Sequence, residues 1–202
     1  MIEYYHPSLQ QYIQKNGIEG HTLEGHIGNI PRQQERLREL VKNAHNILEI
    51  GFNCGHSSDL FLRSSNANIV SFDLGTHHYL ITGKNFIDTF YPNRHVLIIG
   101  NSVQTIPSYM KQHPDKKFDI IFIDGGHDYE IAKSDLENCK RFAHKSTIVI
   151  MDDVVSDRDL YWNVGPKKAW REAEEKSKII TLGREDYSRG RGMIWGKYDR
   201  KN

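Results

Sequence analysis

The sequence lacks a long apolar run, a cysteine framework and a large net charge of either sign. No apolar stretch approaches the ~20 residues that a membrane-spanning helix needs, and the first residues lack the basic-then-apolar pattern of a secretory signal. The two cysteines, Cys54 and Cys139, form no CxxC pair, which argues against a disulfide scaffold and fits a reducing compartment. We therefore expect a cytoplasmic protein with no membrane partner.

The charges are nearly balanced, with 27 lysines and arginines against 26 aspartates and glutamates. A nucleic-acid-binding surface usually requires an excess of basic residues, so nucleic acid is not the expected partner, although a local basic patch stays compatible with this balance. A small molecule is the expected partner, and association of identical chains is left open. The length of 202 residues predicts a single domain over 1–202 with a substantial core.

Apolar runs typical of strands alternate with helical patterns along most of the chain. Residues 1–30 are polar and interrupted by glycines, and a helical pattern begins at Pro31, so a helical and loop cap is expected over 1–45. Strands are predicted at 47–50, 69–72, 95–99, 118–123 and 147–151, with a closing hairpin at 179–182 and 192–196. Helices are predicted at 57–63, 79–91, 103–112, 129–143 and 166–178. This alternation over 46–202 predicts an α/β fold, with a mostly parallel seven-stranded sheet, helices on both faces and an antiparallel strand near one edge.

A glycine-rich turn follows the first predicted strand, in the stretch NILEIGFNCGHS that ends at Ser57. Glu49 lies inside the apolar run, where a carboxylate needs a partner. Gly51 and Gly55 allow backbone conformations and close approaches that a side chain would block, and the helix N-terminus that follows favours a polar or anionic ligand group. Because Asn53 occupies the place of the middle glycine in the dinucleotide-binding motif, an ordinary strand-to-helix turn would give the same residues.

Three of the predicted strands end in aspartates. Asp73 follows the second strand, about 20 residues after Gly51, where an acid can accept hydrogen bonds from ribose hydroxyls. The structural alternative is that Asp73 caps a helix or lies in a loop.

Asp124, Asp152 and Asp153 follow two strands that should be neighbours in the sheet. Carboxylates that converge at one edge repel each other unless they are protonated or neutralised, and a hard divalent cation with oxygen ligands neutralises them. All-oxygen ligands favour magnesium, with manganese or calcium as alternatives, and some of these acids could instead cap the segments that follow. His127 lies beside this group after Gly125 and Gly126, and its near-neutral pKa suits a general base, although loop histidines are often incidental.

Three segments in this order, EIGFNCGHS, FDIIFIDGGHDY and IVIMDDV, resemble class I S-adenosylmethionine-dependent O-methyltransferases. The resemblance covers about residues 25–197 and is closest to the metal-dependent branch with catechol O-methyltransferase and the macrocin-type (macrolide-sugar) enzymes. It implies a Rossmann-like methyltransferase fold, with S-adenosylmethionine and a divalent cation as cofactors. The implied reaction is methyl transfer to a small-molecule hydroxyl of a sugar or other diol, or of a phenol.

The resemblance also implies which residues hold the cofactor. The loop would consist of Glu49, Gly51, Asn53 and Gly55, with His56 and Ser57 near the methionine end. Ile27 and Gly28, upstream of this loop, would close over the methionine carboxylate. Asp73 would hold the ribose, Asn101 and Ser102 would flank the adenine, and Asp124 would border the cofactor.

The same resemblance assigns the chemistry to Asp124 and His127. The metal ligands would be Asp124, Asp152 and Asp153, and His127 matches the general base, which is a lysine in the catechol enzymes and a histidine in the macrolide-sugar branch. Asp153 stands where the catechol branch has asparagine, so this site is more anionic and a sugar-like acceptor is favoured over a catechol.

Residues 154–164 are expected to help form the acceptor pocket. Trp162, Trp170, Tyr187 and Trp195 are candidates to line it, although Trp170 and Trp195 fit core packing better. The basic stretch 184–191 is expected to be a solvated turn, with contact to an anionic substrate as the alternative.

Two other functions share part of this pattern. A nicotinamide-dependent oxidoreductase would have the glycine turn and Asp73, but it would not explain the acids after the fourth and fifth strands. A non-catalytic S-adenosylmethionine-binding module would need none of Asp124, His127, Asp152 and Asp153.

Overall fold

A seven-stranded sheet forms the centre of the protein. The structure is a computed structural model that describes the chain except for residues 1–7, 20–22, 24–25, 155–157, 188–189 and 200–202. The strands are β1 (Asn46–Ile50), β2 (Asn68–Asp73), β3 (His95–Ile99), β4 (Phe118–Ile123), β5 (Ala143–Asp152), β6 (Ile179–Asp186) and β7 (Gly192–Tyr198). They lie in the order β3-β2-β1-β4-β5-β7-β6, which confirms the predicted α/β sheet.

The sheet is mixed rather than uniformly parallel. The pairings among β1 to β5 are parallel, whereas β7 pairs antiparallel with both β5 and β6. The two last strands form the hairpin that the sequence predicted, and a hairpin at the end of a parallel sheet necessarily contributes one reversed strand.

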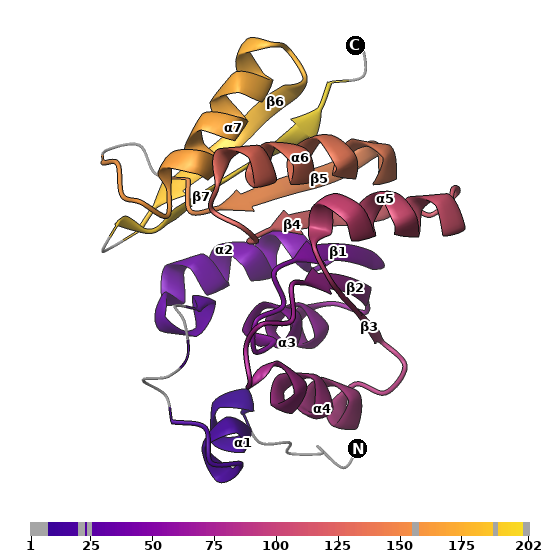
Figure 1. Ribbon diagram of the computed structural model, residues 1–202, viewed down its shortest axis with the longest axis vertical. Helices are drawn as coiled ribbons and strands as arrows, with labels where there is room; N and C mark the ends of the chain where they lie inside the picture. The colour runs from indigo at the N-terminus through magenta and orange to yellow at the C-terminus, as the bar shows by residue number, and fades with distance from the viewer. Residues whose placement is uncertain (1–7, 20–22, 24–25, 155–157, 188–189, 200–202) are drawn as a thin grey trace.

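Helices cover both faces of the sheet (Figure 1). Their bounds are α1 (Leu9–Lys15), η2 (Ile27–Asn29), α2 (Pro31–Val41), α3 (His56–Ser64), α4 (Leu80–Phe90), α5 (Ser102–Gln112), α6 (Tyr129–Cys139), η3 (Lys140–Phe142) and α7 (Val164–Glu175). One core cluster joins α2, α3 and α4 to the sheet, and a second joins α5, α6 and α7 to the opposite face.

The strand sequences are apolar on both faces because both faces are buried. Ile47 belongs to the first core cluster, and its neighbour Leu48 belongs to the second, as the alternation of side chains along a strand requires. Both side chains are fully buried. Near-continuous apolar runs such as residues 118–123 are typical of strands that helices cover on both sides.

Two predicted boundaries are wrong around the sixth helix. The sequence predicted a helix over 129–143, but α6 ends at Cys139, a turn of 3₁₀ helix follows, and Ala143 already begins β5. The helical spacing of apolar residues persists beyond Cys139 because Phe142 still packs in the core from that short turn. β5 therefore begins earlier than the predicted 147–151 and includes Asp152.

The N-terminal segment contributes one short helix and one 3₁₀ turn among the described residues before α2. Ser8 caps α1 in a reciprocal arrangement with Gln11, and α1 packs against α4. Pro31 begins α2, as predicted, because proline suits the first helical turn. Within the described part of the chain, every helix is too short or too polar to span a bilayer.

The strand order reverses between β1 and β4. From β1 the chain adds β2 and β3 on one side of the sheet, and then β4 and β5 on the other. In open α/β sheets the ends of the strands at this reversal leave a crevice where ligands bind. The fold therefore places a candidate binding site after Ile50, Asp73 and Ile123.

Candidate functional site

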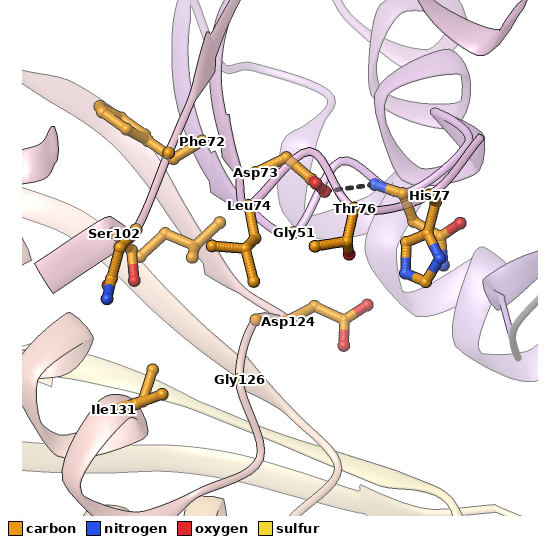
Figure 2. A pocket seen from close by; sticks show the side chains of 15 residues that line it. Gly51, Phe72, Asp73, Leu74, Thr76, His77, Ser102, Asp124, Gly126 and Ile131 are labelled. Carbon is orange, nitrogen blue, oxygen red and sulfur yellow. Dashed lines mark hydrogen bonds between the residues drawn. The ribbon is translucent and has the colours of Figure 1, made fainter. Parts of the chain in front are cut away.

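A cavity of about 240 Å³ lies at the ends of β1, β2 and β4. In the view of Figure 2, Leu74, Ser102 and Ile131 lie toward one side of this cavity, and Asp124 and His77 toward the other. Six of the predicted cofactor residues line it, namely Gly51, Asn53, Asp73, Asn101, Ser102 and Asp124. The cavity is thus built from the strand ends at which the topology predicts a site.

Gly51 forms the wall between β1 and β4. The Gly51 amide donates to Phe72 O at 2.8 Å, and the Asp124 amide donates to Ile50 O at 2.8 Å, so three strand ends are held in register. A Cβ atom on Gly51 would lie 1.8 Å from the Asp124 carbonyl oxygen, and the φ of Gly51 is +92°. Only glycine fits this approach, which explains the glycine that the sequence singled out.

Asp73 fixes the rim of the cavity. One carboxylate oxygen accepts a hydrogen bond from the Asn53 amide at 2.8 Å, and the other accepts from the Gly75 amide at 2.8 Å (Figure 2 shows one of these contacts). Asn53 has a φ of +52°, a conformation that asparagine tolerates better than most residues. The carboxylate therefore ties the turn after β1 to the turn after β2 and keeps lone pairs at the cavity.

The adenine side of the predicted site combines polar and apolar residues. Asn101 caps α5 by accepting from the Val103 amide at 3.0 Å, and Ser102 begins that helix at the cavity wall. Leu74 and Ile131 also line the cavity. The side chain of Leu74 is 61% exposed, so it offers apolar surface to a ligand rather than to the protein core. The sequence analysis missed both residues, although an apolar residue directly after Asp73 was the available signal.

Glu49 has the partners that its burial requires, and it supports the site from below. The buried carboxylate accepts hydrogen bonds from the hydroxyls of Ser57, Ser58 and Ser71, each at 2.5 Å. Burial raises the pKa of Glu49, and the three hydroxyls oppose that rise. Glu49 and Ser57 thus join β1 to α3 and β2, and neither lines the cavity.

The predicted methionine end contains a stacked pair of histidines. The rings of His26 and His56 lie 3.7 Å apart, and the Gly28 amide donates to His26 Nδ1 at 3.1 Å. Burial lowers the pKa of His56 to about 3, and both ring nitrogens are buried without a described partner. Gly55 caps α3 with a φ of +85°, while Ile27 packs into the core beside this group. These residues lie near one another but outside the cavity lining.

Asp124, His127 and Asp153 form the acidic part of the site. One potential ligand atom of each lies within 4.8 Å of the others. Burial and the carboxylates of Asp152 and Asp153 raise the pKa of Asp124 well above its usual range. A hard cation would stabilise such neighbouring carboxylates by neutralising their repulsion.

Asp152 is turned toward another partner. Gln33 Nε2 donates to both of its carboxylate oxygens at 2.8 Å, while the Asp153 amide donates to Oδ1 at 2.9 Å. Burial and the Asp153 charge raise the pKa of Asp152 to about 7. The structure thus groups His127 with Asp124 and Asp153 and leaves Asp152 adjacent, whereas the sequence named the three aspartates as equal ligands.

Asp153 receives two cationic neighbours. His127 Nε2 lies 3.0 Å from one carboxylate oxygen, and Arg191 Nη1 lies 3.0 Å from the other. The hydrogen bond that His127 donates to the Asp153 carboxylate raises the pKa of His127. Arg191 corrects the prediction for residues 184–191, because this stretch includes the end of β6 and a partner of the acidic cluster rather than a solvated turn.

The four aromatic candidates for an acceptor pocket fall into two groups. Trp170 is buried in the core, and its indole donates to Thr181 Oγ1. Trp195 packs against the core with Arg36 over its ring. Both tryptophans thus pack in the core, as the sequence favoured. Tyr187 donates to Glu185. The Arg191 guanidinium lies over the Trp162 ring, with Cζ 5.7 Å from the ring centre. Among these four candidates, Trp162 is thus the one that contacts a partner of the acidic cluster.

Comparison with known proteins defines the family. The model of a family described as a methyltransferase domain matches residues 48–154, which is more than half of the chain and runs from within β1 to just past Asp153. The chain therefore belongs to this methyltransferase family. No curated protein sequence matches the chain.

Solved structures share the fold over nearly the whole chain. An O-methyltransferase from Bacillus cereus in complex with SAH has a TM-score of 0.71 at 20% identity, over 98% of this chain and 94% of that one. A putative caffeoyl-CoA O-methyltransferase from Staphylococcus aureus gives 0.68 at 18% identity over 95% and 93%. CalS11, a TDP-rhamnose 3′-O-methyltransferase of calicheamicin biosynthesis, gives 0.63 at 20% over 92% and 90%. The expected class I methyltransferase fold is confirmed.

Proposed function

We propose that the protein transfers a methyl group from S-adenosylmethionine to a hydroxyl of a small molecule, a sugar or other diol or a phenol, with help from a divalent cation. The observation that carries this proposal is the meeting of two features at Asp124. This residue lines the cofactor cavity and also belongs to the group with His127 and Asp153. A methyl donor on one side of Asp124 and an acceptor on the other would bring the reacting atoms together.

The cavity suits the parts of S-adenosylmethionine. Asp73 offers carboxylate lone pairs to the ribose hydroxyls, and Leu74 and Ile131 offer apolar surface to the adenine beside Ser102. The sulfonium end would then point toward Asp124, where negative charge is concentrated. The solved relative from Bacillus cereus is named as a complex with SAH, the demethylated form of this cofactor.

The acidic group fits a hard divalent cation. Asp124 and Asp153 would hold it, with Asp152 beside them, and magnesium suits such oxygen ligands. When bound, such a cation lowers the pKa of a coordinated hydroxyl and holds a neighbouring oxygen. These carboxylates would supply the charge that retains the cation next to the acceptor.

His127 would remove the hydroxyl proton. With Nε2–H donating to Asp153, the lone pair that can take a proton lies on Nδ1. The oxygen then forms its bond to the methyl carbon as the carbon–sulfur bond breaks, and the proton stays on His127. Asp153 stabilises the imidazolium that results.

A methyl-transfer assay tests this function. Labelled S-adenosylmethionine is supplied with a panel of sugars, sugar nucleotides and catechols, with magnesium or with excess chelator. We expect transfer to fall at least about a hundredfold in each of three cases. Excess chelator and Asp124→Asn remove an electrostatic contribution, and His127→Ala removes the general base. Asp88→Asn, which changes an exposed acid on α4, is the control and should keep full activity.

Persistent transfer in excess chelator and in Asp152→Ala would contradict the cation-assisted mechanism. Tight cofactor binding without turnover on any acceptor would instead favour a non-catalytic S-adenosylmethionine-binding module. A sugar or other diol is the preferred acceptor class, because a histidine rather than a lysine follows the Asp124 turn.

A further inference from the structure

The acidic cluster contains a built-in cation. Arg191 Nη1 contacts both oxygens of Asp153, at 3.0 and 3.4 Å, and the side chain of Asp153 is only 2% exposed. The guanidinium also interacts favourably with the charges of Asp152 and Asp124. A buried carboxylate is costly without such a partner.

The fold, rather than chance, holds Arg191 in this place. It directly precedes β7, which pairs with β5 so that Met193 lies opposite Asp152. The Val154 amide donates to Gly192 O at 3.0 Å, which fixes the backbone next to Arg191 against the segment after Asp153. The guanidinium lies over the Trp162 ring on the other side. Three separate contacts thus hold the Arg191 side chain next to the acidic cluster.

The charges of Arg191 and Asp153 balance each other. Asp124, Asp152 and Asp153 bring three carboxyl groups together, so Asp153 adds one negative charge to those of the other two. Arg191 adds one positive charge in direct contact with that aspartate, so the pair together is neutral. The cluster then presents to a cation about the same net charge as Asp124 and Asp152 would without this pair.

We propose that Arg191 is the counter-ion of Asp153 and sets the affinity of the acidic cluster for a divalent cation. This inference rests on the proposed function, because it concerns the cation that the cluster would hold. Arg191 acts through Asp153 and is a positioning residue rather than a catalytic one. The repulsion between the Arg191 guanidinium and a bound cation falls with distance and with solvent screening. It is therefore strongest for a cation held next to Asp153.

A double-mutant cycle tests the proposal with Mn²⁺ as the probe, measured by calorimetry on chelator-treated protein. In Arg191→Met the affinity for Mn²⁺ should rise about tenfold, because one positive charge leaves the cluster. In Asp153→Asn it should fall about tenfold. The double variant should return to within about threefold of the original protein, since the pair is removed together.

Two further variants separate charge from folding. Arg191→Lys keeps the charge and should keep the affinity, and Arg184→Met removes an exposed arginine of the same hairpin and should change nothing. An unchanged or weaker affinity in Arg191→Met, in protein that unfolds at the normal temperature, would overturn the proposal. Failure of the proposed function is seen separately, as an absence of S-adenosylmethionine binding to the unmodified protein.

Discussion

His95 is a buried residue through which acid should destabilise this protein. It is buried at the start of β3, where Nε2 lies 2.9 Å from the Ser71 hydroxyl that donates to Glu49. Burial lowers the pKa of His95 from 6.5 to about 3. As the pH falls below the pKa of the unfolded chain, the unfolded state takes up a proton that the folded state refuses. The stabilising effect of the neutral ring is therefore lost progressively as the pH falls toward the folded pKa.

His95→Gln should reduce this pH dependence. Between about pH 6 and about pH 4 the free energy of unfolding should fall less steeply than in the unmodified protein, by up to about 1.4 kcal/mol per pH unit, which corresponds to one proton. Chemical denaturation at a series of pH values measures the slope. Comparing slopes cancels the contribution of Glu49, whose raised pKa acts in the opposite direction, and of His56. His78→Gln, an exposed histidine, is the control, and equal slopes in all three proteins would contradict this account.

Gly51 shows how one residue controls the arrangement of whole elements. The chain passes between the ends of β2 and β4 so closely that a methyl group would overlap the Asp124 carbonyl. Gly51→Ala should therefore push β1 and β4 apart at their ends, lower the free energy of unfolding by at least about 3 kcal/mol and impair cofactor binding.

Gly17→Ala is a matched control for that substitution. Gly17 also has a left-handed φ, +76°, but a Cβ atom there would meet no atom within 4 Å. Its cost should be only about 1 kcal/mol, from the backbone conformation alone. Denaturant unfolding of both variants measures the difference, and equal losses would show that the contact between Gly51 and Asp124 is unimportant.

The elements were predictable wherever local pattern and tertiary packing agree. β3 and β4 match the predicted bounds, because apolar runs between polar turns define them. The end of α6 was missed because Phe142 continues the helical spacing although the backbone has already turned toward β5. Hydrogen bonds to the neighbouring strand decide that boundary, and no local pattern reports them.

At the scale of the whole molecule, the topology explains which site residues could be foreseen. The acids at strand ends converge because parallel strands bring their carboxyl ends to one edge, so Asp73 and Asp124 were found from sequence alone. Arg191 was not, because its contact with Asp153 depends on the strand pairing of β7 with β5. The partners of Asp152 and Asp153 lie at sequence separations of 119 and 38 residues, which no local motif encodes.

The resemblance to O-methyltransferases indicated the type of reaction, which the residue pattern alone left open. Neither the turn after β1 nor Asp73 distinguishes a methyltransferase from a nicotinamide-dependent enzyme, because both use a strand, a tight turn and an acid. The segments around Asp124 and around Asp152 and Asp153 carry the distinction, and both lie within residues 48–154, which the methyltransferase family matches. The acceptor side has no comparable motif, so its class is inferred from charge and from His127.

The most direct test of the central claim is calorimetric titration of S-adenosylmethionine, and separately of NADH, into the purified protein. We expect one S-adenosylmethionine per chain and no binding of NADH. Asp73→Asn should weaken S-adenosylmethionine binding at least about tenfold, because it removes a charged acceptor at the cavity rim, whereas Asp88→Asn should leave it unchanged. Binding of NADH in place of S-adenosylmethionine, or unaltered affinity in Asp73→Asn, would contradict the assignment of this cavity.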